Sequence, residues 1–203
     1  MSKSYIKNRS LGILKSKFRS AFSTSQALES GVHPRDLYHL RDIGLIEQVS
    51  RGIYKVIDTD IENLDILVVA HRSPNAIICL ESALSFHEMT TQIPRSVNIA
   101  LPKGAKQPKI DHPPITVFRF SGEAFNCGIG EYEVNNEKVK IYTPEKTLAD
   151  SFKFRNKLGM DVVLEALKIY KDKYRFDARK LMEFSKICRV SKIIQPYVES
   201  LLP

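Results

Sequence analysis

Apolar residues recur at helical spacing through the first part of the chain, and the interruptions between them predict separate short elements. The predicted helices cover about Ser4–Lys17, a short stretch within Phe22–Gly31, and about Pro34–Ile43. Two short strands are predicted to follow, at about Ile46–Val49 and Gly52–Val56, joined through Ser50 and Arg51. Helices in this order, followed at once by a tight hairpin, are typical of a winged helix-turn-helix, here over residues 1–56.

The connection between the second and third predicted helices contains the residue types that such a turn requires. A hydroxyl side chain opens the short helix, and Gly31 ends it, because glycine adopts the left-handed conformation at low cost. His33 and Pro34 then start the next helix, since a proline at the first helical position loses no useful N–H group. Gly31 is therefore expected to form the turn.

The third predicted helix has two different faces. At about 100° per residue, Leu37, Leu40 and Gly44 share one face, which we expect to pack on the first two helices. The opposite face carries Arg35, Tyr38, His39 and Asp42. We expect the DNA-contacting residues to be Arg35, Tyr38 and His39 toward the bases, with Arg41, Ser50 and Arg51 toward phosphate or the minor groove. A solvated face on a protein-binding winged helix is the alternative.

Residues 57–203 predict a second domain of the α/β kind, with a small sheet followed by helices. Its expected strands are Val97–Leu101, Ile115–Phe120, Gly130–Val134 and Lys138–Tyr142, the last two joined at Asn135 and Asn136. Its expected helices are Asp60–His71, Asn75–Met89, 144–157 with Thr143 as cap and Gly159 as end, 161–172, 177–188 and 190–201. The predicted fold class is α+β: a winged helix-turn-helix, then a mixed α/β domain whose C-terminal part is helical.

The helix that begins at Pro144 is the most heavily charged element outside the winged helix. Helical spacing places four charged residues along one face, which we expect to be exposed: Lys146, Asp150, Lys153 and Lys157. An ordinary solvated face, with Lys–Asp pairs worth about 0.2–0.5 kcal/mol each, would explain this stripe. Arg155 lies on the apolar side, so it requires a carboxylate or carbonyl partner, or else marks a surface where an anion docks.

Charge is distributed unevenly along the chain, whose formal net charge is +8. Residues 1–56 hold ten Lys and Arg against four Asp and Glu, residues 57–137 hold six against eleven, and residues 138–192 hold fifteen against seven. A small basic N-terminal unit is suited to neutralising DNA phosphates, although surface lysines also serve solubility.

The cysteines and the apolar runs indicate the compartment. Cys79, Cys127 and Cys188 are odd in number and form no CxxC pair, so they predict neither a disulfide framework nor a zinc site. The longest apolar runs are too short to span a bilayer, and no secretory apolar region follows the first basic residues. We expect a cytoplasmic protein that does not associate with membranes.

The sequence contains no recognisable catalytic constellation. No Glu-x-Lys or Asp-x-Lys occurs, which argues against restriction-type nuclease chemistry, and no Gly-Ser pair precedes Asp58-Thr59-Asp60, as a nucleotidyltransferase would need. His71, His87 and His112 are scattered without the spacing of a triad, and there is no glycine-rich phosphate loop. We expect no enzyme activity, no bound metal and no cofactor.

Four blocks of residues, taken in their order and spacing, make the chain resemble the AbiEi-type antitoxins of abortive-infection toxin/antitoxin systems, often labelled type IV. The blocks are Gly31–Leu40 with Gly44–Ile46, Ser50–Tyr54, Leu80–His87, and Lys146–Asp150 with Arg155 and Gly159 behind it. The last block is the most specific, and the resemblance covers nearly the whole chain.

The resemblance implies a protein that represses its own operon through the winged helix and opposes a toxin similar to a nucleotidyltransferase through the C-terminal domain. The implied DNA partner is operator inverted repeats, on which two protomers would sit as a dimer. The implied antitoxicity surface comprises Lys146, Asp150, Lys153, Arg155 and Lys157. The toxin would be opposed either by contact or by an indirect route.

Two other functions stay open at this point. The larger domain would sense a small ligand if a pocket lies between the sheet and the helix that holds Cys79 and His87. Alternatively, an enzyme of nucleic-acid metabolism would use the winged helix to reach its substrate.

Overall fold

The computed structural model describes residues 3–57, 59 and 61–201, and it divides into two compact units. Unit 1 comprises Met1–Pro74, Pro108–Pro113 and Glu133–Val139, and unit 2 comprises Asn75–Gln107, Pro114–Tyr132 and Lys140–Pro203. The predicted domain boundary between residues 56 and 57 falls inside unit 1. Whether residues 1–56 fold without the rest of unit 1 stays a prediction.

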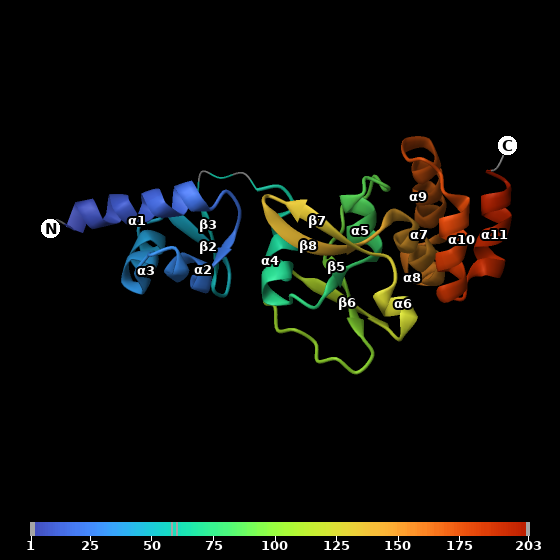
Figure 1. The fold of residues 1–203 in the computed structure, drawn as a ribbon, viewed down its shortest axis with the longest axis horizontal. Coiled ribbons are helices and arrows are strands. Elements are labelled where there is room, and N and C mark those ends of the chain that lie inside the picture. The colour runs from blue at the N-terminus through green and yellow to red at the C-terminus, as the bar shows by residue number, and fades with distance from the viewer. Residues whose placement is uncertain (1–2, 58, 60, 202–203) are drawn as a thin grey trace. The chain divides into compact units, whose positions relative to one another are not determined.

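Unit 1 is built from short helices around a small antiparallel sheet (Figure 1). Its elements are α1 (Lys3–Lys17), β1 (Phe22–Ser23), α2 (Thr24–Glu29), α3 (Pro34–Asp42), β2 (Ile46–Ser50), β3 (Ile53–Val56) and α4 (Leu64–Arg72). The strand order is β1-β3-β2, and Phe22 of β1 pairs with Tyr54 of β3. The predicted helices and hairpin are present, whereas β1 was not predicted, because a strand of two residues has no periodicity to detect.

The core of unit 1 forms where α3 packs on its neighbours. Leu37 and Leu40 of α3 are fully buried, as are Leu14 of α1 and Ala27 of α2, together with Tyr54 from the sheet. Burying a leucine side chain contributes about 1.5–3 kcal/mol, so this contact fixes the inward face of α3 and leaves its other face outside.

Local capping explains where α2 and α3 begin and end. The Gln26 N–H donates to Ser23 Oγ (3.2 Å) and the Ser23 N–H donates to Gln26 Oε1 (2.7 Å), which together form a capping box. Gly31 (φ 94°) and Gly44 (φ 69°) each follow a helix, and the next residues, Val32 and Leu45, donate back to carbonyls of the last turn. Both helices therefore end in a Schellman motif, which confirms the predicted turn at Gly31.

The helix α4 begins later than predicted. It starts at Leu64, after Asn63 in the left-handed conformation (φ 54°), and the predicted cap Asp60 lies outside the described residues. Its buried side includes Val68, which packs with Ala21 and Ile53 beneath the small sheet. This helix is therefore part of the support of the hairpin.

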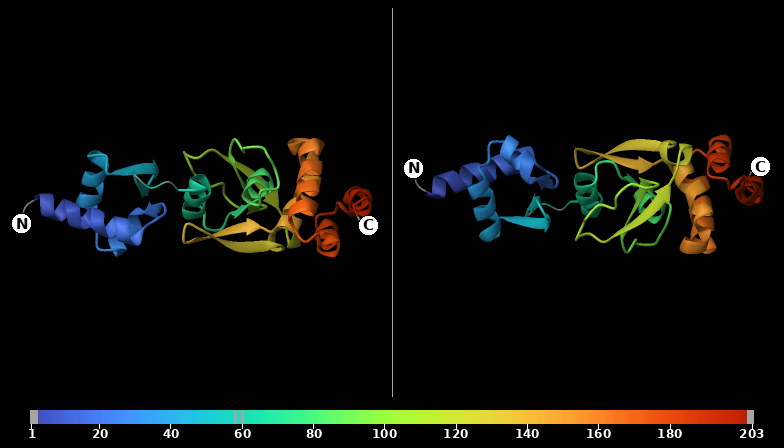
Figure 2. Two further views of the ribbon diagram at one scale, coloured as in Figure 1. Left: turned by 90° about the horizontal axis from the view of Figure 1, so that it is seen from above. Right: turned by 90° about the horizontal axis from the view of Figure 1, so that it is seen from below.

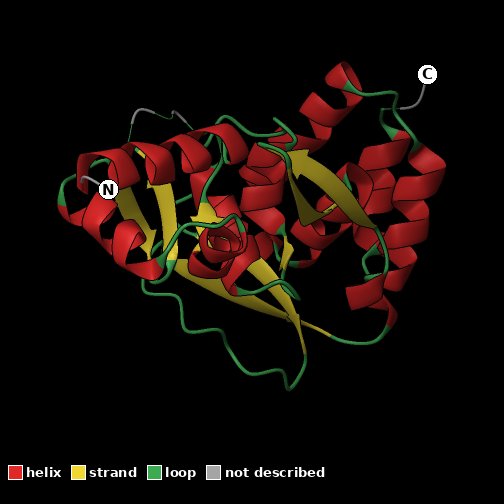
Figure 3. Cartoon of the chain, turned by 60° about the vertical axis from the view of Figure 1, so that its left-hand side comes forward, coloured by secondary structure: helices red, strands yellow, loops and turns green. Residues whose placement is uncertain are grey.

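Unit 2 contains most of a five-stranded mixed sheet, drawn as yellow arrows in Figure 3. The strands are β4 (Ile77–Ile78), β5 (Val97–Pro102), β6 (Ile115–Phe120), β7 (Ile129–Val134) and β8 (Glu137–Tyr142), in the order β6-β5-β4-β8-β7. β4 runs antiparallel to β5 and parallel to β8, and β5 runs parallel to β6. The strands β7 and β8 extend into unit 1 at the turn through Asn135 and Asn136, whose φ angles are positive.

The predicted helix Asn75–Met89 is wrong in its first half. The chain there forms β4 and then α5 (Leu80–Phe86), because Ile77 and Ile78 are a buried apolar run at the centre of the sheet. Short apolar runs of this kind fit a buried strand and a buried helix equally well in the sequence.

Helices make up the C-terminal part of unit 2. They are α7 (Pro144–Lys153), α8 (Arg155–Leu158), α9 (Met160–Lys173), α10 (Ala178–Ile187) and α11 (Ser191–Glu199), and α6 (Glu123–Asn126) is a single turn before β7. The orange and red helices α9 to α11 gather beyond the strands in both views of Figure 2. The predicted α+β class is confirmed.

Two details of the predicted helix 144–157 are wrong. It is interrupted at Phe154, which leaves helical geometry (φ −100°, ψ 17°), so α7 and α8 are separate. Thr143 makes no side-chain cap, and its Oγ1 has no hydrogen-bond partner among the described residues. Gly159 (φ 97°) ends α8 as predicted.

Gly128 is required by a close approach of two segments. A Cβ at this position would lie 2.5 Å from Lys146 Cβ and 3.1 Å from Phe184 Cζ, and φ is +66°. Gly104 has a similar φ of +88° but open space around it.

We predict that Gly128→Ala lowers the free energy of unfolding by about 2–5 kcal/mol, the sum of backbone strain and overpacking. Gly104→Ala is the matched control and should cost only the strain, about 1–2 kcal/mol. Urea unfolding followed by circular dichroism measures both. Equal losses in the two variants would contradict the close approach.

Candidate functional site

The outward face of α3 presents the residues predicted to read DNA bases. Arg35, Tyr38 and His39 are all exposed, and 43% of the Tyr38 surface is accessible, while Leu37 and Leu40 lie beneath them in the core. The His33 imidazole accepts a hydrogen bond from the Arg35 N–H (3.2 Å) and so caps the start of α3. The helix therefore holds a guanidinium, a phenol and an imidazole on one rigid surface, as the sequence predicted.

Arg41 is arranged differently from the other basic residues of α3. Its Nε and Nη2 donate to Asp42 Oδ1 at 2.9 and 2.7 Å, and its guanidinium lies 5.3 Å from the centre of the Tyr38 ring. The hydrogen bond to Asp42 raises the pKa of Arg41, so the guanidinium stays charged. Since Asp42 offsets that charge, Arg41 attracts phosphate less strongly than an unpaired arginine would.

The tip of the hairpin exposes Arg51 but not Ser50. Ser50 is the last residue of β2, where it pairs with Ile53, and its side chain is buried. The turn consists of Arg51 and Gly52 (φ 74°). The expectation that Ser50 contacts DNA is therefore corrected: its side chain is buried and does not reach a ligand, whereas Arg51 is exposed at the tip.

Arg72, which was not predicted to have a role, supports this tip. Its Nη1 donates to the Arg51 carbonyl (3.2 Å) and its Nη2 donates to the Lys109 carbonyl (2.9 Å). One planar guanidinium thus ties the hairpin turn to the segment Pro108–Pro113 of the same unit. The side chains of Arg51 and Lys109 are both exposed.

The predicted charged stripe of α7 is mostly not a surface. Lys146 and Asp150 are completely buried, which overturns the expectation that they are exposed. The helix α7 is packed against α5, α9, α10 and α11, and every residue from Glu145 to Phe152 is buried. A helix that is covered on all sides has no solvated face for its charges, so helical spacing alone misplaced them.

The two buried charges satisfy each other and a thiol. Lys146 Nζ donates to Asp150 Oδ2 and lies 4.1 Å from the centre of the Tyr142 ring and 4.9 Å from that of Phe120. Cys188 Sγ donates to Asp150 Oδ1 (3.2 Å). Burial raises the pKa of Asp150 against the opposing effect of Lys146, and burial together with Asp150 raises the pKa of Cys188 to about 12. The cluster is a structural tie between α7, the sheet and the end of α10.

The other three residues of the predicted C-terminal surface are accessible. Lys153 and Lys157 are exposed, with Lys153 Nζ 5.7 Å from the Phe120 ring and Lys157 Nζ 5.5 Å from the Phe118 ring. Arg155 is half-buried, and its Nη1 donates to the Phe152 carbonyl (3.0 Å). Arg155 thus has the carbonyl partner that its position requires. The role of these residues in antitoxicity stays a prediction.

The sequence places Cys79 and His87 beside a possible ligand pocket, and a ligand there stays a prediction. Both side chains are buried, and His87 Nε2 donates to the Tyr142 carbonyl (2.7 Å), which fixes the neutral tautomer. Burial lowers the pKa of His87.

In the described part of the chain, no three His, Cys, Asp or Glu residues are grouped so that they could hold a metal. None of the helices described there is both long and apolar enough to cross a membrane.

Comparison with known families matches the part of the chain that holds the helix-turn-helix and hairpin. Residues 16–56 fit the family described as "Transcriptional regulator, AbiEi antitoxin". The match is to the AbiEi antitoxin family over these residues, which are called the AbiEi segment below. The AbiEi segment contains α2, α3 and the whole hairpin, so it includes the exposed residues of α3 named above and Arg51. The predicted resemblance is confirmed over these residues.

Comparison with solved structures extends the likeness of fold beyond the AbiEi segment. The chain is similar to the RV2827C protein from Mycobacterium tuberculosis, with a TM-score of 0.59 and 14% sequence identity, over 98% of this chain and 80% of that one. At this identity the similarity shows a shared fold. No curated protein matches the chain.

Sequence reasoning missed two features around the AbiEi segment and beyond it. Arg72 was missed because its partners at Arg51 and Lys109 are distant in sequence. The burial of Lys146 and Asp150 was missed because charged residues four apart on a helix usually lie in solvent. Gly128 was an indication that Lys146 is buried, because its missing Cβ leaves room for the aliphatic part of the Lys146 side chain.

We predict that Asp150→Ala lowers the free energy of unfolding by about 3–5 kcal/mol, because Lys146 is left as an uncompensated buried charge. Replacing both partners, with Lys146→Met and Asp150→Leu, should recover most of that loss. Lys173→Ala is the control, since it breaks the exposed pair with Glu88 and should cost at most about 1 kcal/mol. Chemical denaturation measures all three, and a double variant no more stable than Asp150→Ala would refute this account.

Proposed function

We propose that this protein is a DNA-binding transcriptional regulator that represses its own operon and serves as the antitoxin of an AbiE-like pair. It acts by binding and not by catalysis. The observation that carries the proposal is the exposed face of α3, with Arg35, Tyr38 and His39 side by side within the AbiEi segment.

The proposed mode of DNA binding follows from that geometry. The helix α3 enters the major groove, where the Arg35 guanidinium bonds a guanine edge and Tyr38 and His39 meet neighbouring bases. Arg51 at the hairpin tip, held by Arg72, reaches phosphate or the minor groove. The operator consists of inverted repeats, so two protomers bind as a dimer, one on each half-site.

The antitoxin role is proposed for unit 2, where Lys153, Arg155 and Lys157 are accessible and basic. The opposed protein is a toxin similar to a nucleotidyltransferase. Lys146 and Asp150 contribute by holding α7 in place and not by contact, since both are buried.

Two substitutions test DNA binding, with operator affinity measured by gel shift at several salt concentrations. Arg35→Ala should cost about 1–3 kcal/mol and relax the preference for one base pair, because it removes a base contact. Arg51→Ala should weaken binding to all DNA sequences alike, because it removes a phosphate contact. It should also reduce the slope of log affinity against log salt concentration by about 1. The double variant should show no shift.

Arg95→Ala is the matched control for these variants, because it removes an exposed arginine of unit 2. It should bind as the unchanged protein does. An unchanged affinity in both Arg35→Ala and Arg51→Ala would remove the assignment of α3 and the hairpin.

The antitoxin role is tested by survival of cells that co-express the neighbouring nucleotidyltransferase-like protein. Combining Lys153→Ala, Arg155→Ala and Lys157→Ala should reduce rescue while the operator shift is unchanged, because the two functions use different units. Lys168→Ala, an exposed change on α9, is the control. Full rescue by the triple variant would exclude this surface, and no toxicity to rescue would leave a regulator without a toxin.

A further inference from the structure

A basic groove lies in unit 2 where the α7–α8 corner approaches the α10–α11 corner. Its volume is about 900 Å³. Four cationic side chains line it, Lys153 and Arg155 from the first corner and Lys186 and Arg189 from the second, and Glu123 is the acidic residue among the lining. The sequence indicated only the first two, because Lys186 and Arg189 are more than thirty positions farther along the chain.

These four cations are available to a ligand. Within the described part of the chain none of them forms an ion pair with a carboxylate, and Arg155 uses one of its five N–H groups on the Phe152 carbonyl. Elsewhere in unit 2, two lysines are paired with carboxylates: Lys173 with Glu88 (3.0 Å) and Lys180 with Glu145 (3.2 Å). The groove therefore concentrates uncompensated positive charge at one place.

Arg189 occupies a backbone position that would suit glycine better. Its φ is +61°, and the Val190 N–H donates to the Ser185 carbonyl (2.8 Å), so Arg189 is the left-handed residue of a Schellman motif. At Gly31 and Gly44 the equivalent residue is glycine. An arginine at this position carries a conformational cost that glycine would not, and its guanidinium lines the groove.

The rest of the lining indicates which anion fits. Ile187, Val190 and Ile193 of the α10–α11 corner add aliphatic side chains to the lining, and none of the described residues that line the groove is aromatic. Single-stranded nucleic acid is usually held by aromatic rings on which its bases stack. Aliphatic contacts flanked by cations suit carboxylates and aliphatic side chains on one polypeptide segment.

We propose that this groove binds an acidic segment of a partner protein, with Glu or Asp side chains on the four cations and an aliphatic side chain against Ile187, Val190 and Ile193. The proposal rests on the antitoxin role proposed above, because it gives the chemistry by which the opposed protein would be contacted directly. It adds Lys186 and Arg189 to that surface.

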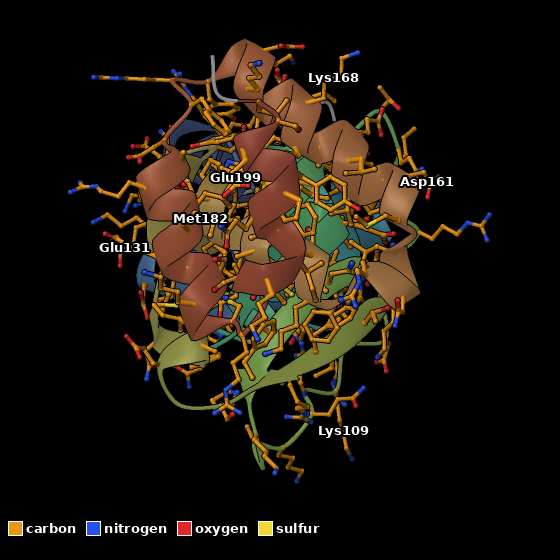
Figure 4. The ribbon with its side chains drawn as sticks, turned by 90° about the vertical axis from the view of Figure 1, so that its right-hand side faces the viewer. Lys109, Glu131, Asp161, Lys168, Met182 and Glu199 are labelled. Atoms are coloured by element: carbon orange, nitrogen blue, oxygen red, sulfur yellow. The ribbon has the colours of Figure 1, made fainter. Side chains whose placement is uncertain are left out.

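The test is fluorescence anisotropy of the full chain with a labelled short peptide built of Glu and Leu. A peptide of Glu and Ser tests the aliphatic contact, and single-stranded oligouridylate tests a polyanion. We expect the Glu–Leu peptide to bind most tightly, and Lys186→Glu to weaken it about tenfold, which corresponds to about 1.4 kcal/mol. Lys168→Glu makes the same charge change on α9, apart from α10 in Figure 4, and should have little effect.

Arg189→Gly separates binding from folding. It should keep or raise the melting temperature, because glycine relieves the positive φ, and yet weaken peptide binding, by less than Lys186→Glu does because it removes a charge without reversing it. Three outcomes would each overturn the proposal. They are the absence of peptide binding, equal peptide binding by Lys186→Glu and the unchanged protein, and tighter binding of oligouridylate than of the peptide. The operator shift is measured on the same variants and should be unchanged, so a failure here is distinguishable from a failure of DNA binding.

Discussion

The burial of α7 is the constraint on which unit 2 depends. A helix packed between α5, α9, α10 and α11 must lose the hydration of every polar group it carries, and α7 carries a lysine and an aspartate at its centre. Their ion pair, completed by the Cys188 thiol and two aromatic rings, makes that burial tolerable. The same arrangement fixes the ends of α7 and α10, and so fixes the two basic corners that flank the groove.

The N-terminal unit could be predicted well from the sequence because its determinants are local. Ser23 and Gln26 cap a helix across one turn, and Gly31 and Gly44 end helices where a positive φ is needed. The alternation of Leu37 and Leu40 with Arg35, Tyr38 and His39 assigned the two faces of α3 correctly. These features act within four or five residues, so a single sequence contains all the information.

The failures of prediction at β4 and in α7 concern contacts between distant residues. β4 appeared helical because its neighbours in the sheet, β5 and β8, come much later in the chain. Ser50 appeared to belong to the turn because the register with Ile53 depends on the hairpin as folded. The stripe of Lys146 and Asp150 appeared exposed because nothing within α7 reveals how many helices surround it.

The hairpin is also held by Arg72 of α4, a residue outside the AbiEi segment. The segment that matches the AbiEi family ends at Val56, yet the hairpin turn at Arg51 is hydrogen-bonded by a guanidinium from α4. The same guanidinium donates to the Lys109 carbonyl. The segment that matches the family is therefore shorter than the set of residues that holds the hairpin in place. Residues 16–56 alone would retain α3 and the hairpin but would lose the Arg72 guanidinium that holds the hairpin turn, and also the α1 residue Leu14 from the core beneath α3.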